Sequence, residues 1–357
     1  MRWLILLVAL LAAHTVEAQE PASGRDLYRG ACAACHGTDG TGLPQAALGF
    51  DVAVPDFTDC SFATPEADAD WLAVVHDGGP ARAFDRRMPA FGEALKEDEI
   101  LRVLDYIHEF CGDGRWPRGE LNLPRALVTE KAFPENETVL TTTVALDGAG
   151  AVANELLYER RLGARTQFEV IVPFVSHDTG GQWRSGLGDV GAAVKRVLVH
   201  SRQRGSIFSV TGEVVFPTGK ESEGLGSGVA VFEPFLAFGQ ILPADAFLQV
   251  QAGAELPRRG AKEAFWRAAL GRTIVSGRFG RSWSPIVELL AAREMESGAR
   301  VEWDAVPQMQ VSLSKRQHVL ISAGVRVPVT GRSARGAQLM TYVLWDWFDG
   351  GIRDGWR

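Results

Sequence analysis

Apolar residues follow two different patterns along the chain, and the pattern changes near residue 136. In residues 22–111 they recur at helical spacing in three segments. In the last segment Ile100, Leu104 and Ile107 share one face, and Gly112 follows the final turn as a helix-ending glycine. This part of the chain is therefore predicted to be a small all-α domain, with helices at 26–34, 68–76 and 97–110.

Residues 137–348 instead alternate with period two. Phe168, Val170 and Val172, for example, lie on one face of a predicted strand while their neighbours lie on the other. About twelve such segments occur, each of roughly ten residues, which is the length that a tilted strand needs to cross a membrane. They lie near 138–147, 154–162, 166–175, 187–200, 205–217, 227–239, 246–256, 264–275, 284–295, 303–314, 318–328 and 337–348.

The connections between these segments indicate how they are joined. Short ones such as 163–165 and 315–317 alternate along the chain with longer ones such as 176–186, as in outer-membrane barrels. The connection 276–283 is longer than this rule predicts. We therefore predict an antiparallel β-barrel of about 12 strands. A soluble two-sheet domain is the alternative, because its strands alternate in the same way. Charges in mid-strand favour the barrel with its wet lumen, among them Glu169, Glu213 and Glu255.

Three further segments complete the domain organisation. Residues 1–18 combine Arg2 with an apolar run and a small-residue cleavage pattern, which predicts a signal peptide and hence export. A retained N-terminal anchor is the alternative for this segment. Residues 112–136 lack periodicity and contain three prolines, so we expect an extended linker. Residues 349–357 are expected to form a C-terminal tail.

The composition of the chain excludes several classes of protein. The 357 residues are 46% hydrophobic, which excludes a largely disordered chain. The formal net charge of −7 argues against nucleic acid as the partner, because such partners call for a basic surface. The sequence contains no pattern typical of a hydrolytic triad, a phosphate loop or a nucleotide fold. None of these classes of enzyme is therefore indicated.

The residues with the most specific chemical pattern are those of the run Cys32-Ala33-Ala34-Cys35-His36. A C-x-x-C-H run is typical of covalent haem attachment, because two thiols three residues apart can reach both vinyl groups of one porphyrin edge. The adjacent imidazole then lies under the iron. A redox dithiol or half of a zinc site would share the C-x-x-C spacing, but neither needs His36. We expect one covalent haem c, with His36 as a ligand of its iron.

The second axial ligand is expected to be Met88, which precedes a proline in an extended segment. A methionine opposite a histidine raises the reduction potential, which suits an electron carrier. Two alternatives stay open: Met88 could be a core methionine that fills a gap, and His76 could be the ligand instead.

Residues 22–111 resemble class I cytochromes c. The resemblance rests on Tyr28, the C-x-x-C-H run with Gly37, the segment Met88-Pro89-Ala90-Phe91, and a final helix with Asp105-Tyr106-Ile107. It implies that the first and last helices cross. It also implies thioether bonds from Cys32 and Cys35, axial ligation by His36 and Met88, and Arg86 and Arg87 as candidates for the haem propionates.

Two cysteines remain outside the haem motif. Because leftover thiols usually pair in an oxidising compartment, we expect a disulfide between Cys60 and Cys111. The barrel segment is loosely similar to outer-membrane proteins associated with phenol-degradation pathways, through Gly186–Val190 and Phe216–Lys220. The whole arrangement is also similar to fused cytochrome–porins.

Together these features predict a c-type cytochrome that transfers single electrons. Its barrel would hold it at the periplasmic face of the outer membrane, with lipid around the barrel and periplasmic electron-transfer proteins as partners. One alternative is an outer-membrane channel for a small solute with an accessory haem domain. The other is a soluble periplasmic cytochrome with a β docking domain. A twelve-stranded lumen is too narrow for the helical domain, so we expect that domain at the mouth of the barrel.

Overall fold

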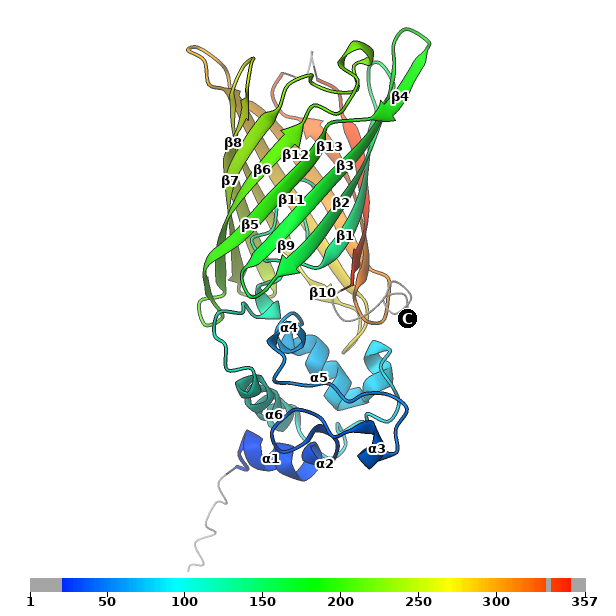
Figure 1. The fold of residues 1–357 in the computed structure, drawn as a ribbon, viewed down its shortest axis with the longest axis vertical. Coiled ribbons are helices and arrows are strands. Elements are labelled where there is room, and N and C mark those ends of the chain that lie inside the picture. The colour runs from blue at the N-terminus through cyan, green and yellow to red at the C-terminus, as the bar shows by residue number, and fades with distance from the viewer. Residues whose placement is uncertain (1–20, 332–334, 348–357) are drawn as a thin grey trace, which may run out of the picture.

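The structure is a computed structural model that describes residues 21–331 and 335–347. The predicted signal peptide (1–18) and C-terminal tail (349–357) lie outside the described residues. A group of helices forms one end of the molecule and a cylinder of strands the other (Figure 1). None of the described helices has the length and apolar character needed to span a bilayer.

Two of the three predicted helices, 68–76 and 97–110, are present as single helices, whereas the predicted helix 26–34 is divided at Cys32 into two. The helices of the helical domain are α1 (Gly24–Ala31), α2 (Ala33–His36), α3 (Gln45–Leu48), α4 (Cys60–Ala63), α5 (Asp68–Asp77) and α6 (Glu97–Phe110), with a short 3₁₀ turn η1 (Gly79–Arg82). The Ser23 hydroxyl caps α1 by accepting the Asp26 N–H at 3.2 Å. A β-carbon on Gly24 would lie 2.0 Å from the Arg102 carbonyl oxygen, so this glycine lets α1 cross α6 closely.

The core of this domain lies between the two crossing helices and α5. Tyr28 of α1 is fully buried against α6, where Ile100, Val103 and Leu104 are at most 1% exposed. This is the face that the spacing of apolar residues in 97–110 predicts. The expected crossing of the first and last helices is therefore present.

Twelve strands close into a cylinder, which confirms the predicted barrel. β14 pairs antiparallel with β1, so the sheet closes on itself and the alternative of two separate sheets is wrong. The strands of the cylinder are β1 (Glu137–Ala145), β2 (Ala151–Leu162), β3 (Thr166–Asp178), β5 (Val190–Ser201), β6 (Ser206–Phe216), β7 (Val231–Leu242), β8 (Ala246–Pro257), β9 (Glu263–Arg272), β11 (Ser282–Glu294), β12 (Glu302–Ser312), β13 (Val319–Pro328) and β14 (Gln338–Asp346).

Two short strands and two short turns complete the elements. β4 (Trp183–Leu187) extends the sheet beside β3 at the rim far from the helices, and β10 (Ile274–Val275) pairs with β11 at the helical end. The 3₁₀ turns η2 (Gly119–Leu121) and η3 (Glu221–Glu223) lie outside the sheet. The predicted strand 187–200 is therefore β5, which starts at Val190, while β4 lies almost wholly in the predicted connection 176–186.

The outer surface of the cylinder is apolar. Alternate side chains on the strands point outward and are exposed, among them Leu140, Leu156, Val194, Leu236, Leu270, Val287, Leu289 and Val343. Tryptophans lie near both ends of this surface. Trp266 and Trp303 touch each other near the far rim, with ring centroids 5.9 Å apart, and Trp347 stacks on Tyr158 toward the helical end. An apolar outer surface with tryptophans near both ends is typical of barrels that span a membrane.

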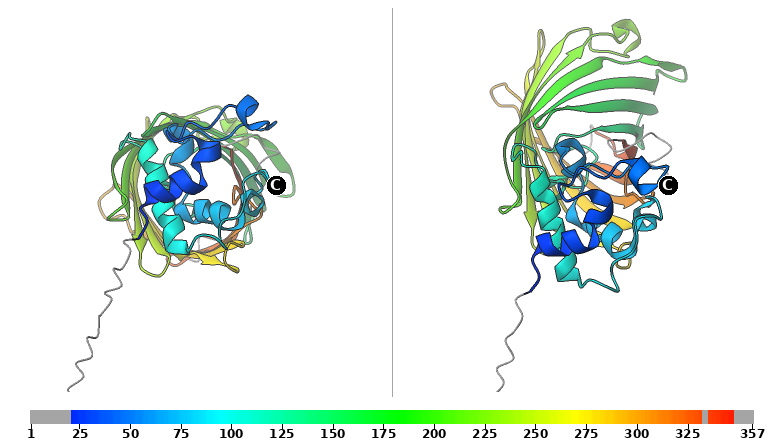
Figure 2. Two further views of the ribbon diagram at one scale, coloured as in Figure 1. Left: turned by 90° about the horizontal axis from the view of Figure 1, so that it is seen from below. Right: turned by 60° about the horizontal axis from the view of Figure 1, so that its bottom comes forward.

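The helical domain lies across one mouth of the cylinder, as expected from its size (Figure 2). The overlong connection after β10 has a structural reason, because it contacts this domain. The Phe279 carbonyl accepts a hydrogen bond from Arg82 at 2.8 Å, and Arg278 forms an ion pair with Glu97 at 2.6 Å.

The predicted linker does more than connect the two parts. After η2 it enters the cylinder, and we call residues 121–135 the plug segment. Leu121 and Phe133 are each 1% exposed and pack on inward side chains of the barrel. Hydrogen bonds or ion pairs join the plug segment to β1, β2, β3, β5, β8, β9, β11, β12 and β14. Apolar contacts join it to β6, β7 and β13.

The plug segment also changes the interpretation of the mid-strand charges. Arg125 contacts Glu137 at 2.7 Å and Glu159 at 3.1 Å, and Lys131 contacts Glu137 at 3.3 Å. These carboxylates belong to strands and are almost completely buried. At this level the lumen therefore holds a packed network of paired charges in place of the open water that the sequence suggests.

Candidate functional site

A cavity of about 740 Å³ lies beside the core of the helical domain. Cys32, Cys35, His36 and Met88 all line it, so the structure brings together the four residues proposed for the haem. Most of the remaining wall is apolar, with Phe57, Phe62, Trp71, Val75, Phe91 and Ile107. Such a volume and lining are typical of a cofactor pocket.

Local structure fixes the C-x-x-C-H run. Cys32 caps α2, which carries Cys35 and His36, so one helical turn presents both thiols and the imidazole to the same cavity. The Tyr28 hydroxyl donates a hydrogen bond to the Gly37 carbonyl at 2.8 Å and so ties the end of this turn to α1. Gly37 has a φ of +71°, a conformation that favours glycine.

The protonation states of these groups suit covalent haem attachment. Burial lowers the pKa of His36 to about 4, so its imidazole is neutral at pH 7 and can donate a lone pair to a metal. Its Nδ1 is buried and has no hydrogen-bond partner among the described residues. Burial, and then the neighbouring Cys35, raise the pKa of the Cys32 thiol to about 11. Both cysteines are free, so the residues present fit a thioether-linked haem.

The loop that carries Met88 is held against Gly79. The Gly79 N–H donates to the Met88 carbonyl at 3.0 Å. A β-carbon on Gly79 would lie 2.2 Å from the Asp85 carbonyl oxygen, so only glycine allows this approach. Met88 is thereby placed on the cavity wall with its side chain packed against the domain core.

Other ligand candidates lie elsewhere. His76 is not among the described residues that line the cavity, and its ring faces Asp77 and Phe279. Met295 and Met309 are exposed on the barrel, and Met340 is buried inside it. The geometry therefore favours Met88 over the alternative ligand His76.

A disulfide joins Cys60 at the start of α4 to Cys111 at the end of α6. It closes a loop with a sequence separation of 51 and ties the cavity wall around Trp71 to the last helix.

Replacing both Cys60 and Cys111 by serine is expected to destabilise the helical domain by about 4 kcal/mol, because the unfolded chain gains the entropy of an open loop. Denaturant unfolding followed by circular dichroism at the helical band measures the effect, because the helices belong to this domain. An unchanged midpoint, with the wild type shown to be oxidised, would contradict this prediction.

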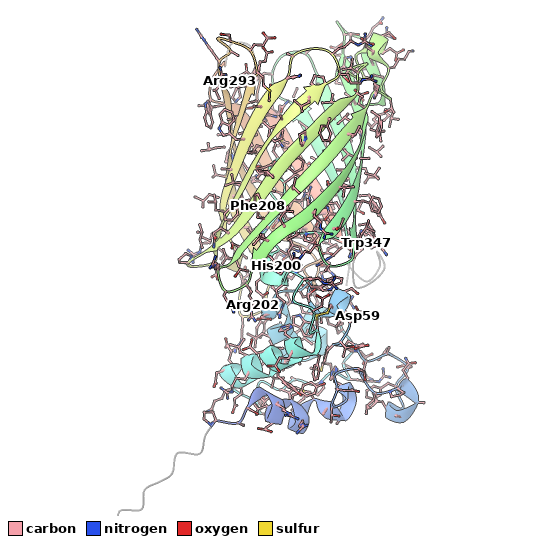
Figure 3. The ribbon with its side chains drawn as sticks, turned by 60° about the vertical axis from the view of Figure 1, so that its left-hand side comes forward. Asp59, His200, Arg202, Phe208, Arg293 and Trp347 are labelled. Carbon is pink, nitrogen blue, oxygen red and sulfur yellow. A yellow bond between two sulfur atoms is a disulfide. The ribbon has the colours of Figure 1, made fainter. Side chains whose placement is uncertain are left out.

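A charged cluster fixes the helical domain to the barrel. Asp68 at the start of α5 lies 2.8 Å from the His108 ring and 2.9 Å from Arg118. It also lies 2.9 Å from Arg202, which belongs to the turn between β5 and β6. Figure 3 shows Arg202 and His200 at the end of the barrel that meets the helices.

The pKa of Asp68 gives this contact a pH dependence. Burial raises that pKa, but the hydrogen bond with His108 and the charge of Arg118 outweigh burial and hold it well below its ordinary value of 3.8. The native state therefore binds this proton less tightly than the unfolded chain. The contribution of Asp68 to stability is complete above about pH 4 and is lost as the pH falls further.

Asp68→Asn is expected to weaken the contact between the domains by about 1 kcal/mol, because Arg118 and Arg202 lose their closest carboxylate and the Arg202 side chain is partly exposed to solvent. Hydrogen exchange in α5 and in the turn 202–205 should then be faster at pH 7. Lowering the pH below about 4 should accelerate the wild type more than the variant. Asp98→Asn is the matched control, since Asp98 pairs only with a neighbour one turn along α6. Equal exchange in both variants would refute the role of Asp68.

Comparisons with known proteins find a different likeness for each of the two parts of the chain. Residues 19–107 match the family described as cytochrome c oxidase, cbb3-type, subunit III. The helical domain is therefore a cytochrome c domain, and membership of this class implies covalently bound haem c. No curated protein matches the chain.

Several solved structures are similar to the barrel part. An outer-membrane channel from Pseudomonas putida F1 is 13% identical, with a TM-score of 0.44 over 62% of this chain and 99% of that one. The KdgM porin is 9% identical, with a TM-score of 0.40 over 59% and 99%. The NanC porin is 8% identical, with a TM-score of 0.42 over 58% and 98%.

Two parts of the structure around the site are not predicted by the sequence patterns. Arg316 and His318 belong to the turn between β12 and β13, yet they line the cavity of the helical domain. The second part is the plug segment, for which the sequence patterns predict only an extended linker. Its signal in the sequence is the presence of Leu121, Leu123, Leu127 and Phe133, which are too many large apolar residues for a solvated connector.

Proposed function

We propose that the helical domain holds one haem c through thioether bonds from Cys32 and Cys35, with His36 and Met88 as the axial ligands. The observation that carries this proposal is that all four side chains line one cavity. When bound, the haem supplies reversible one-electron transfer. His36 and Met88 would occupy both axial positions, which favours an electron carrier over a catalyst. The apolar walls exclude water, and the sulfur of Met88 raises the reduction potential.

We propose further that the barrel spans the outer membrane and that the cytochrome domain lies on the periplasmic side. The outward apolar side chains and the two levels of tryptophan support insertion in lipid. They disfavour the alternative of a soluble β docking domain. The turns at the helical end are short apart from the connection between β9 and β11, as periplasmic turns of such barrels are.

The plug segment favours electron transfer over solute transport. It contacts every strand of the cylinder and places buried ion pairs across the lumen. A solute would have to break these pairs in order to pass. The apolar band of such a barrel is about 25 Å tall, and one haem at one mouth does not bridge it. The domain therefore exchanges electrons with soluble periplasmic proteins, and the barrel holds it at the membrane.

Sided reduction in proteoliposomes tests this function. A membrane-impermeant reductant, added outside, should reduce only those haems whose cytochrome domain faces outward, and trypsin digestion counts that fraction independently. A soluble c-type cytochrome should then reoxidise the same fraction. Complete reduction of inward-facing haems would contradict the proposal, because electrons would have crossed the barrel.

A further inference from the structure

One wall of the haem cavity comes from the barrel. Arg316 and His318 lie in the turn between β12 and β13, and both line the cavity together with residues 82–87 of the cytochrome domain. The cavity is therefore complete only when the two domains are docked. A cytochrome c domain of this class would otherwise build its pocket from its own residues.

Contacts with the cytochrome domain hold these two side chains in place. The Arg316 guanidinium lies over the Phe84 ring, with its carbon 4.4 Å from the ring centroid. Its Nη2 donates to the Ala83 carbonyl at 3.4 Å. His318 is 4% exposed, and its Nε2 lies 2.5 Å from a carboxylate oxygen of Glu66.

The turn that carries them is itself well defined. The Ser314 hydroxyl accepts the N–H groups of His318 at 3.0 Å and Val319 at 3.1 Å, which fixes the backbone at the start of β13. A side chain on such a turn is positioned by the rigid sheet rather than by a free loop. Arg316 is therefore held at the cavity before any cofactor is bound.

The charges on the cavity wall fit an anionic ligand. The charged side chains of the lining come from three places: the region of α5, the segment 82–87 and the barrel turn. Four of them are arginines, Arg82, Arg86, Arg87 and Arg316, and three are carboxylates, Glu66, Asp70 and Asp85. Arginine predominates, although two of the four are already paired: Arg82 with Asp70 at 2.6 Å, and Arg87 with Asp85 at 3.2 Å and Asp51 at 2.5 Å.

The haem brings two carboxylates of its own. Its propionates lie on the half of the porphyrin away from the vinyl groups, which Cys32 and Cys35 would hold. They need cationic partners, and the planar guanidinium of arginine matches a carboxylate with two parallel hydrogen bonds. The charged wall formed by 82–87 and the barrel turn is where such partners lie.

We propose that Arg316, a barrel residue, binds a haem propionate and so completes the cofactor site of the cytochrome domain. This inference rests on the proposed haem c, and it adds that the barrel tunes the haem as well as anchoring it. A positive charge beside the cofactor favours the reduced iron. Removing it should lower the reduction potential and loosen the turn 313–318.

Redox titration of the full-length, haem-loaded protein tests this assignment. Arg316→Gln should shift the haem equilibrium toward the oxidised form by on the order of tenfold. Arg316→Lys keeps the charge and should give a smaller shift. Arg278→Gln is the matched control, because Arg278 also joins a barrel turn to the cytochrome domain but does not line the cavity. Its potential should equal that of the wild type.

The outcomes separate this inference from the function on which it rests. Covalent haem on a denaturing gel in the wild type and all variants, with a lowered potential in Arg316→Gln alone, supports the inference. The same haem content with an unchanged potential in Arg316→Gln overturns it and leaves the proposed cytochrome intact. Equal downward shifts in Arg316→Gln and Arg278→Gln also overturn it, since loss of docking would then explain both. A wild type without covalent haem would remove the proposed function itself.

Discussion

Replacing Met88 by alanine is expected to lower the reduction potential of the haem by a large part of the roughly 0.8 V range over which axial ligands set such potentials. The physical reason is the loss of the thioether, which favours reduced iron. The charge-transfer band of sulfur-ligated ferric haem should disappear, while the thioether bonds of Cys32 and Cys35 keep the haem on the chain. Redox titration and absorption spectroscopy of the purified protein measure both effects.

Two variants serve as controls for this prediction. Met309→Ala removes an exposed methionine from the outer surface of the barrel and should leave spectrum and potential unchanged. His76→Ala tests the alternative ligand and should also have no effect on the iron, because His76 does not line the cavity. A wild-type spectrum in Met88→Ala, or loss of the sixth ligand in His76→Ala, would show that the axial ligand is assigned wrongly.

Replacing the plug segment, residues 121–135, by a glycine–serine sequence of equal length is expected to open the barrel. Leu121, Leu123 and Phe133 hold the segment in the lumen by burying their side chains, and Arg125 pairs with two buried carboxylates. A glycine–serine chain makes none of these contacts and has no reason to stay inside. In planar bilayers the wild type should give no stable current steps, and the variant should give steps of defined size.

The control for this experiment leaves the lumen unchanged. A glycine–serine replacement of residues 296–300, in the loop between β11 and β12 at the far rim, should stay as closed as the wild type. Stable current through the wild type would contradict the closed barrel and favour the alternative of a solute channel. A closed plug variant that is correctly inserted would show that other residues block the lumen.

Much of this architecture follows from local sequence signals. The amphipathic face of 97–110 gives α6 with its predicted bounds, because capping residues and a following glycine define a helix within a few residues. The strands follow from period-two alternation, since each carries one face to lipid and one to the interior. The C-x-x-C-H run can be recognised from the sequence because it keeps its chemistry within five consecutive positions.

Errors in strand boundaries come from contacts between loops. The predicted strand 227–239 lies at Val231–Leu242 in the structure. The loop before it is folded by Asp189, which accepts the N–H groups of Gly219 and Ser227. Asp189 also lies in the gap between β4 and β5 that the sequence does not reveal. Such contacts join residues about 30 positions apart, and no local pattern reports them.

The plug segment and the barrel residues that line the cavity depend on contacts between residues that lie still farther apart in the sequence. The Thr129 N–H and hydroxyl both donate to Glu288, and Arg316 reaches Ala83. The sequence does show the two kinds of partner separately, as basic residues in the predicted linker and carboxylates in the middle of strands. Pairing them requires the closed cylinder, because only closure brings the inward faces of all strands around one axis.

A haem stain of fractionated membranes tests the central claim most directly. We expect one band in the outer-membrane fraction that keeps its haem after denaturation. The same band should run at a different position when the sample is not heated. Retained haem reports the thioether bonds of Cys32 and Cys35, and heat-dependent migration reports the folded barrel. Haem that separates from the chain on denaturation, or a protein recovered from the soluble periplasm, would contradict a covalent cytochrome anchored by a membrane barrel.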